Sequence, residues 1–299
     1  MKVAVMGAGA VGCYYGGMLA RAGHEVVLIG RPQHVAAFNR TGLRLQAQSF
    51  DDTIPVRADT NAAIAGGADL VLFCVKSTDT ETAGAQLREH LRADTLVLTL
   101  QNGTDNAERL RGVIAQEVAA AVVYVATEMA GPGHVRHHGR GELVIEPATR
   151  SREAADALIA AGVPTEISDN VRGALWLKLI LNCAYNALSA VTQLPYGKIV
   201  QNPGVPAVIA HLVAECRAVA AAEGVTLAGD VDAAVRRIAE TMPTQYSSTA
   251  QDLARRKPSE IDHLNGFIVR RGQALGVPTP VNLTMHTLVR LVEARQAEQ

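Results

Sequence analysis

The first half of the chain alternates short apolar runs with stretches of helical pattern. Lys2 to Met6 and Glu25 to Ile29 are apolar runs, and the stretch from Cys13 to Ala22 between them has a helical pattern. Two later runs, Asp69 to Val75 and Thr95 to Leu100, are almost wholly apolar, as expected of parallel strands that are buried on both faces. This order predicts an α/β domain of the Rossmann type with a mostly parallel sheet.

The rest of the first half adds smaller elements to this predicted sheet. We expect a hairpin, a short helix, further strands that extend the sheet in antiparallel fashion, a helix with Ser151 as its N-cap, and a last strand. These elements are predicted at 43–45 with 54–56, at 61–64, at 118–126 with segments around Val135 and at 143–145, at 151–161 and at 164–167.

From Asp169 onward the apolar positions recur at helical spacing, and the pattern contains no convincing strand. Asp169 is the expected N-cap of the first helix, and Ser259 with Asp262 predicts a capping-box-like start of a later one. The predicted helices run from 169 to before Pro195, then over 206–223, 230–241, 247–257, 259–275 and 281–298. The fold class is therefore a Rossmann-type domain at 1–168 followed by an all-α domain at 169–299.

The turn after the first apolar run carries the motif G-x-G-x-x-G, as Gly7-Ala8-Gly9-Ala10-Val11-Gly12. Between a strand and a helix this motif predicts a dinucleotide site. Gly7 permits the tight turn, Gly9 lets the backbone approach a pyrophosphate, and Gly12 lets helix and strand pack closely. The pyrophosphate would lie at the helix N-terminus, where free N–H groups favour anions. An ordinary turn between strand and helix is the alternative.

The end of the second strand indicates which dinucleotide is bound. A site for NAD would place Asp or Glu there, next to the ribose 2′-hydroxyl. This chain has Gly30, Arg31, Pro32 and Gln33, with no acidic residue until Asp51. A guanidinium can bind a 2′-phosphate through paired hydrogen bonds, so Arg31 predicts NADP. A solvated surface arginine is the alternative interpretation.

Polar residues follow the two later strands directly. Lys76 comes after the run that ends at Val75, and Gln101-Asn102-Gly103 comes after Leu100. Ligands gather at the carboxyl ends of the strands in an open parallel sheet, so we expect Lys76 and Asn102 beside the cofactor. For Asn102 the alternative is an Asn-Gly turn that exists for purely conformational reasons.

The helix that opens the second half carries a polar stripe on an otherwise apolar surface. Lys178, Asn182 and Asn186 stand at i, i+4 and i+8, and steps of four residues drift by only about 40° around a helix. One ammonium and two amides therefore share a narrow face, which suggests a polar seam that faces a cleft. The alternative is a lysine whose head reaches solvent.

Composition limits the classes of function. The chain has 299 residues, of which 48% are hydrophobic and 19% charged, with a formal net charge of −1. Nothing suggests nucleic acid, and the polar residues within the longest uncharged run argue against a membrane span. The four cysteines are far apart and the N-terminus lacks a signal-peptide pattern, so we expect free thiols and a cytoplasmic location. His134, His137 and His138 lack partners at metal-site spacing, and we expect no metal.

Several stretches, in order and over nearly the whole chain, are similar to one known family, the ketopantoate reductases. The signatures W-x-K-x-x-x-N-x-x-x-N and E-I-D-x-x-N-G are much more specific than the glycine motif. The matching segments are the glycine motif at 7–12, Cys74-Val75-Lys76-Ser77, Gln101-Asn102-Gly103, 176–186, 247–252 and 259–266.

The resemblance implies an enzyme that reduces 2-dehydropantoate to (R)-pantoate with NADPH, a step of pantothenate biosynthesis. It implies Lys178 as the general acid, Asn102 in contact with nicotinamide and substrate, and Glu260 near both ligands. It also implies that Asn182, Asn186 and Ser248 hold the substrate and that Arg31 and Lys76 hold NADP. Taken by themselves, Glu260 and Ser248 are equally well explained as residues that favour helix N-termini.

At one position the chain departs from some members of the family, which carry a substrate-binding Asn where this chain has Tyr196. This leaves open a related NADPH-dependent reductase of another branched 2-keto acid, or an enzyme like the β-hydroxyacid dehydrogenases. A non-catalytic NADP-sensing module is an alternative of a different class. The expected partners are a small 2-keto acid and, if the last helices expose an apolar face, a second copy of the chain in a homodimer.

Overall fold

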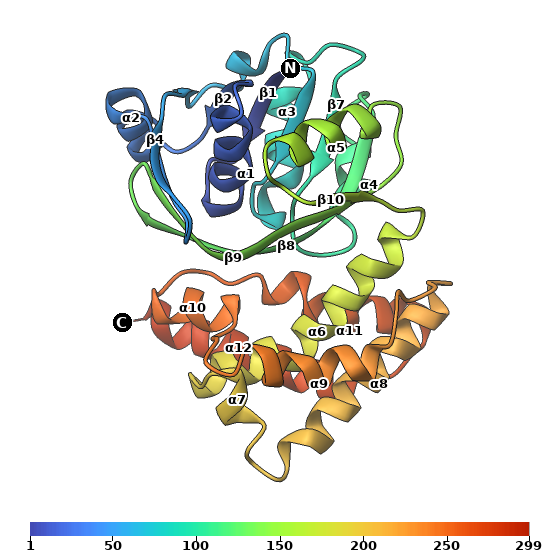
Figure 1. Ribbon diagram of the computed structural model, residues 1–299. Coiled ribbons are helices and arrows are strands. Elements are labelled where there is room, and N and C mark those ends of the chain that lie inside the picture. Colours follow the sequence, from blue (N-terminus) through green and yellow to red (C-terminus); the bar gives the residue numbers. More distant parts are fainter. Residues whose placement is uncertain (299) are drawn as a thin grey trace. The chain divides into compact units, whose positions relative to one another are not determined.

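The computed structural model describes residues 1–298. The chain forms two compact units, Met1–Val171 and Arg172–Gln299, which we call unit 1 and unit 2 (Figure 1). Each unit is described separately below.

Unit 1 is built on one mixed sheet with the strand order β4-β3-β9-β8-β7-β6-β1-β2-β5, and β10 pairs with β9. From β8 to β5 every pairing is parallel, and β9 is antiparallel to β8. The strands are β1 (Lys2–Met6), β2 (Glu25–Ile29), β3 (Leu43–Gln46), β4 (Asp51–Ile54), β5 (Arg57–Asp59), β6 (Leu70–Phe73), β7 (Leu96–Thr99), β8 (Val118–Gly131), β9 (His134–Ile145) and β10 (Thr165–Ile167).

The parallel part of this sheet confirms the predicted Rossmann-type fold. Its chain order runs from β1 outward to β2 and β5 on one side, and from β6 to β7 and β8 on the other. The direction in which strands are added therefore reverses between β1 and β6. Ligands of open α/β sheets bind outside the carboxyl ends of the strands at such a point, and Gly7 and Cys74 are located there.

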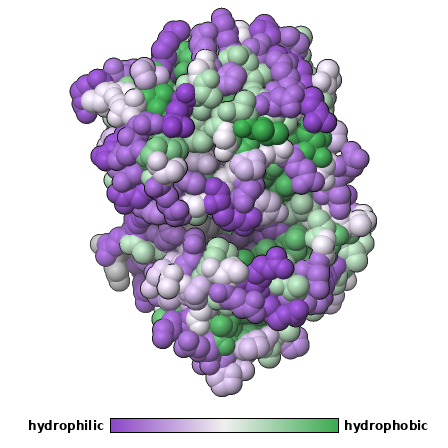
Figure 2. Space-filling view, in the orientation of Figure 1, coloured by the Kyte–Doolittle hydropathy of each residue, from purple (hydrophilic) through white to green (hydrophobic). Residues whose placement is uncertain are grey.

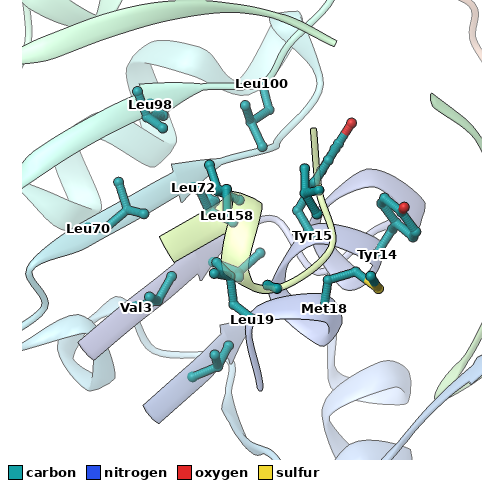
Figure 3. Close-up of a cluster of buried hydrophobic side chains, with 14 of the residues drawn as sticks. Val3, Tyr14, Tyr15, Met18, Leu19, Leu70, Leu72, Leu98, Leu100 and Leu158 are labelled. Atoms are coloured by element: carbon teal, nitrogen blue, oxygen red, sulfur yellow. The ribbon is translucent and has the colours of Figure 1, made fainter. Parts of the chain in front are cut away.

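Helices cover both faces of the sheet. Side chains alternate between the faces along each strand, and Val3, Leu70 and Leu98 share one face with Tyr15 of α1 and Leu158 of α5 in the cluster that Figure 3 shows. The buried leucines of α3 and α4 lie outside this cluster and cover the other face. The helices are α1 (Ala10–Arg21), α2 (Pro32–Thr41), η1 (Ala62–Ala65), η2 (Ser77–Asp79), α3 (Thr80–Leu87), α4 (Asn106–Arg111) and α5 (Ser151–Ala160).

Unit 2 is helical throughout its described residues, as predicted. Its main core lies around Trp176, Ile180 and Cys183, each at most 2% exposed, and includes Phe267 and Ile268 from a later helix. The helices are α6 (Val171–Thr192), α7 (Tyr196–Ile199), α8 (Val205–Ala222), α9 (Val231–Thr241), α10 (Ser248–Ala254), η3 (Ile261–His263), α11 (Asn265–Leu275) and α12 (Pro280–Ala297).

Two helices, α6 and α8, are long and apolar enough to cross a bilayer by length and composition alone, and the core helix of a water-soluble protein meets the same test. Trp176 and Ile180 of α6 and Leu212 and Cys216 of α8 are buried in the helical unit. On the face of the protein that Figure 2 shows, hydrophilic residues predominate and hydrophobic residues form small scattered groups.

The sequence pattern missed five helices and one strand: α2, η2, α3, α4, α7 and β5. These are short elements with few apolar positions. For example, α2 buries only Ala37 and Phe38. Its Pro32 occupies the first turn, where proline begins a helix rather than ending one. Short amphipathic helices of this kind leave little periodic signal in the sequence.

Three predicted caps are wrong. Ser151 lies inside α5, whose N-cap is Arg150, and its Oγ donates to the Glu146 carbonyl at 2.7 Å. Asp169 lies two residues before α6, which begins at Val171. Asp262 does not complete a capping box. Its carboxylate instead binds His286 Nε2 of α12 at 2.6 Å.

The predicted helix over 259–275 is in fact two helices. Leu264 has φ −111° and ψ −105°, which separates η3 from α11. The break places Asn265 in the core, fully buried, where its Nδ2 donates to the Cys183 carbonyl of α6 at 3.3 Å and to Asn282 Oδ1 at 2.9 Å. Apolar periodicity does not register such a buried polar residue.

Candidate active site

The glycine turn between β1 and α1 depends on the absence of side chains. Gly7 has φ +103°, and a Cβ there would lie 2.6 Å from the Val75 backbone nitrogen, at the end of β6. A Cβ on Gly12 would lie 2.4 Å from the Gly7 carbonyl and 2.7 Å from Val5 Cγ1. The turn thus lies directly against β1 and β6, where the strand order reverses.

Gly9 differs from the other two glycines because the space beside it is open. No heavy atom of residues 1–298 lies within 4 Å of a Cβ placed on Gly9, once its chain neighbours are set aside. Gly9 is also the N-cap of α1, and it makes no side-chain capping bond. The first N–H groups of a helix have no partners within the helix, so this end of α1 can receive an anion. These features fit the pyrophosphate of a dinucleotide.

Arg31 follows β2 and forms the N-cap of α2, with its side chain exposed. The neighbouring strand adds an acidic residue that the sequence argument did not consider. Asp59 pairs with Ile29 in the β2–β5 register, and its carbonyl accepts the Gly30 N–H at 3.1 Å. Its carboxylate accepts the Asn61 N–H at 3.0 Å. An arginine and a carboxylate therefore both lie near the end of β2.

Lys76 and Asn102 lie at the carboxyl ends of β6 and β7, which are adjacent parallel strands. Lys76 is exposed and Asn102 is half-buried. The Asn102 carbonyl accepts two hydrogen bonds, from Ser77 Oγ at 3.0 Å and from Asn106 Nδ2 at 2.6 Å. The two strand ends are therefore joined directly through the Asn102 carbonyl.

The polar stripe of unit 2 lies along α6. Lys178 and Asn182 are half-buried, whereas Asn186 is 3% exposed. Asn186 Nδ2 lies 3.4 Å from Ser248 Oγ and 3.5 Å from Thr249 Oγ1, so α10 meets the stripe at its third residue. The stripe thus combines an ammonium with amides whose positions are set by a helix that is packed into the core.

Ser247 and Ser248 are adjacent at the start of α10 but have different surroundings. Ser247 is buried and caps α10, since its Oγ accepts the Ala250 N–H at 3.0 Å and donates to the Asn186 carbonyl at 3.2 Å. Ser248 is exposed beside Asn186. Of the two hydroxyls, that of Ser248 is thus the one accessible to a ligand.

Glu260 is half-buried and occupies the N-cap position of η3, without a side-chain capping bond. Its carbonyl accepts the His263 N–H at 2.8 Å. Asn265, five residues later, is tied to the Cys183 carbonyl of α6. The segment that carries Glu260 is thereby fixed to the same helix as Lys178.

Tyr196 belongs to the core of unit 2. It is 9% exposed, and its ring meets that of Tyr185 edge-on with centroids 5.2 Å apart. Burial, with a smaller contribution from Tyr185, raises the pKa of Tyr196 to about 12. The Tyr196 side chain is therefore part of the packed core. The Asn that some family members carry at this position could instead bind substrate.

The four cysteines and the three histidines at 134, 137 and 138 take part in packing and in contacts with other side chains of the protein. Cys13, Cys183 and Cys216 are buried and Cys74 is half-buried, all as free thiols, and burial raises the pKa of Cys183.

The three histidines lie on β9, where His137 stacks on Tyr14, His134 binds Gln46 and His138 binds Glu128. Within residues 1–298 no group of three or more His, Cys, Asp or Glu side chains is arranged to hold a metal.

The predicted site residues therefore form two groups. The glycine turn, Arg31, Lys76 and Asn102 lie at the carboxyl edge of the sheet in unit 1, and Lys178, Asn182, Asn186, Ser248 and Glu260 lie on or beside α6 in unit 2. The sequence argument missed Asp59 and Asn106. Asp59 ends the strand that pairs with β2, which precedes Arg31, and Asn106 lies four residues after Asn102. A search for polar residues at these two places would have found them.

Comparison with known proteins gives matches over nearly the whole chain. The family models "Ketopantoate reductase PanE/ApbA" and "Ketopantoate reductase PanE/ApbA C terminal" match residues 3–150 and 170–293. A protein of Halobacterium salinarum named 2-dehydropantoate 2-reductase is 34% identical, and the match covers 98% of this chain and 99% of that one.

Two solved structures are similar over their full lengths. A PanE/ApbA family ketopantoate reductase from Ralstonia eutropha JMP134 is 68% identical with a TM-score of 0.97, covering 99% of this chain and 100% of that one. A D-mandelate dehydrogenase in complex with NADH and anilino(oxo)acetate is 26% identical with a TM-score of 0.92 and the same coverage. The chain belongs to the ketopantoate reductase family of oxidoreductases.

Proposed function

We propose that this enzyme uses NADPH to reduce 2-dehydropantoate to (R)-pantoate, a step of pantothenate biosynthesis. The observation that carries the proposal is the stripe of Lys178, Asn182 and Asn186 on α6, in a chain that matches a 2-dehydropantoate 2-reductase from end to end. An ammonium with flanking amides suits a small keto acid, whose carboxylate and carbonyl oxygens accept hydrogen bonds.

Unit 1 supplies the groups that would hold the cofactor. The open side of Gly9 and the N-terminus of α1 suit the pyrophosphate, and Arg31 suits the 2′-phosphate of NADP. Lys76 would also hold the cofactor. Asn102 would contact the nicotinamide and the substrate. Bound NADPH would supply the hydride that reduces the keto carbon.

Lys178 has the chemistry of the proton donor. As the carbonyl is reduced, negative charge develops on its oxygen. A positioned ammonium stabilises this charge and then delivers the proton that completes the alcohol. Asn182, Asn186 and Ser248 would orient the substrate, and Glu260 would lie near substrate and cofactor.

The test is to follow NADPH absorbance with purified enzyme and a panel of 2-keto acids. We expect 2-dehydropantoate to give the highest kcat/KM and NADPH to be preferred to NADH. Negligible turnover of 2-dehydropantoate beside rapid turnover of another acid would reassign the substrate. A preference for NADH would contradict the interpretation of Arg31.

A second candidate is the reduction of another branched 2-keto acid. Two observations favour it: Tyr196 is a buried core residue where some ketopantoate reductases have a substrate-binding Asn, and a D-mandelate dehydrogenase shares the fold. The substrate panel should therefore include 2-oxoisovalerate and an aryl 2-keto acid. The alternative of a non-catalytic sensor is not supported, because the relatives matched over the full length are enzymes.

We further propose a cytoplasmic location and a homodimer. The face of α12 exposes Leu283, Leu288 and Leu291, at 49%, 39% and 61%, and an apolar face of this kind is often covered by a partner. Light scattering coupled to size-exclusion chromatography should give the mass of a dimer, and replacing Leu291 with Lys should shift it to that of a monomer.

A further inference from the structure

A cluster of buried polar side chains lies behind the carboxyl ends of β6 and β7. Ser77 and Thr80 are fully buried, Asn106 is 3% exposed and Gln101 is 6% exposed. A buried polar group without a hydrogen bond typically costs about 1–3 kcal/mol, and most polar atoms of these side chains bind one another. Gln101 Nε2 donates to Thr80 Oγ1 at 2.8 Å, whereas Gln101 Oε1 has no hydrogen-bond partner among residues 1–298. The cluster lies entirely within unit 1 and is next to Lys76 and Asn102.

Asn106 is at the centre of the cluster and uses both ends of its amide. Its Nδ2 donates to the Asn102 carbonyl at 2.6 Å and to Ser77 Oγ at 3.2 Å. Its Oδ1 accepts from Thr80 Oγ1 at 3.1 Å and from Arg109 Nη1 at 3.3 Å. This amide therefore has two donated and two accepted hydrogen bonds.

The same contacts hold the strand end that carries Lys76. Ser77 follows Lys76 directly, and its carbonyl accepts from Arg109 Nη2 at 2.8 Å. The same carbonyl lies 3.1 Å from Thr80 Oγ1, so it shares the single Thr80 hydroxyl proton with Asn106 Oδ1. Ser77 Oγ donates to the Asn102 carbonyl at 3.0 Å. The backbone after β6 and the backbone after β7 are thus joined through Asn106, Ser77 and Arg109.

Only a side chain with a donor on one end and an acceptor on the other can make these contacts. Aspartate would face the Asn102 carbonyl and the Ser77 hydroxyl with an oxygen that cannot donate when ionised. Leucine or alanine would leave the hydroxyl of Thr80 and the Asn102 carbonyl with fewer partners in a buried place. The amide of Asn106 is therefore matched to its position.

We infer that Asn106 is a positioning residue for the reaction, one that acts through Asn102. This inference rests on the proposed function, in which the Asn102 side chain contacts the nicotinamide and the substrate. By fixing the Asn102 carbonyl, Asn106 fixes the backbone from which that side chain projects. A displacement of about 1 Å in a catalytic arrangement can reduce the rate by about 100-fold.

The test is a double-mutant cycle on kcat/KM, measured with the 2-keto acid that the wild-type enzyme reduces fastest. Asn106→Ala should lower kcat/KM by about 10- to 100-fold. Ser77→Ala, which removes one of two donors to the Asn102 carbonyl, should lower it by a smaller factor. In an Asn102→Ala background both changes should have effects of less than about threefold, because the group they position is gone. The Kd of NADPH, measured by fluorescence, should change by less than about threefold.

Thr95→Val provides the matched control for loss of stability. Thr95 is 1% exposed, immediately precedes β7 at its amino end, and donates from Oγ1 to the Ala68 carbonyl at 2.7 Å. Removing its hydroxyl should lower Tm while kcat/KM stays at the wild-type value. If Asn106→Ala does not fold, Ser77→Ala is measured in the same cycle.

The inference is overturned if folded Asn106→Ala or Ser77→Ala has wild-type kcat/KM. It is also overturned if their effects persist at full size in the Asn102→Ala background, or if Thr95→Val reduces kcat/KM equally. Failure of the proposed function would appear elsewhere. A wild-type enzyme that reduces no 2-keto acid contradicts the function and the inference together, whereas additivity in an active enzyme contradicts the inference alone.

Discussion

The two units present their candidate ligand groups by different means. In unit 1 the groups belong mainly to the backbone: the glycine turn, the N-terminus of α1 and the ends of β6 and β7. Gly7 and Gly12 are required there because a Cβ on either would lie less than 3 Å from backbone atoms. In unit 2 the groups are side chains on α6, and the path of that helix is set by the buried residues on its other face, such as Ile180.

This difference separates what each unit can tolerate. A binding site made of backbone groups is lost when the path of the backbone changes. Steric limits therefore restrict which residues can occupy its positions. A side-chain site on a rigid helix can change chemistry without changing the fold, since half-buried positions such as Lys178 and Asn182 do not fill the core. We therefore expect cofactor binding to be coupled to stability at Gly7 and Gly12 of unit 1, and catalysis to be separable from stability in unit 2.

The largest expected effect is that of Lys178→Ala. Loss of a positioned proton donor typically costs about 10²–10⁴ in rate, so kcat should fall by that factor. The Kd of NADPH should stay nearly unchanged, because Lys178 is not one of the groups proposed to hold the cofactor. Lys198→Ala, at an exposed lysine of α7 in the same unit, is the control and should keep full activity. An unchanged kcat for Lys178→Ala would remove the proton-donor role.

Gly9→Ala and Gly12→Ala sharpen the comparison within unit 1. At Gly9 the new methyl would enter open space, so Tm should change little while the Kd of NADPH rises by about tenfold or more. At Gly12 it would lie 2.4 Å from the Gly7 carbonyl, and overpacking of this kind typically costs about 1–3 kcal/mol. Thermal unfolding and NADPH titration would separate the two effects. Equal losses of Tm in both variants would contradict the assignment of Gly9 to the ligand.

Arg31→Ala tests one of the side chains that complete the unit 1 site beside the glycine turn. If its guanidinium binds the 2′-phosphate, the Kd of NADPH should rise by about 10- to 100-fold, while the Kd of NADH changes by less than about threefold. Arg40→Ala, at an exposed arginine in the last turn of the same helix, is the matched control. Equal losses for both cofactors would indicate a structural role at the N-cap of α2.

The sequence predicted those features whose cause is local. The glycine motif could be recognised because each glycine answers a constraint within its own turn, and the α6 stripe because its spacing is that of a helix. The break at Leu264 could not be predicted, since it depends on Asn265 reaching the Cys183 carbonyl of α6, 82 residues earlier in the chain. Helix α2 was missed because it buries two residues only.

The network around Asn106 shows the same limit within the site. Each of its members has an ordinary interpretation as a turn or cap residue, and nothing in their spacing connects Ser77 with Asn106. The connection arises from the parallel pairing of β6 with β7, which brings residues about 25 to 30 positions apart into hydrogen-bond contact. Sequence indicates which strand ends can bear ligands, and the strand order decides which residues support them.

The smallest expected effect concerns the pH dependence of stability in unit 1. The pKa of Asp69 is lowered by the hydrogen bond from the Lys2 N–H and, against the opposing effect of burial, by the guanidinium groups of Arg92 and Arg150. A carboxyl whose pKa is lower in the folded state stabilises the fold above its ordinary pKa of 3.8, and this contribution is lost as the pH falls through the folded value. Asp69→Asn should therefore cost about 1 kcal/mol at pH 7 and progressively less as the pH falls below 3.8.

Asp262→Asn is the matched variant in unit 2, because the pKa of Asp262 is also lowered. Burial acts most strongly and raises this pKa, but the hydrogen bond to His286 and the charges of His286, Arg290 and Arg270 together lower it further. If the two units unfold separately, Asp69→Asn should shift only the transition that reports on the sheet, and Asp262→Asn only the other. Circular dichroism at the strand and helix bands, followed during heating, would resolve the two transitions. A single transition that both variants shift equally would mean that the backbone-built and side-chain-built sites share one cooperative fold. In that case the stability losses of Gly12→Ala would reach α6 as well.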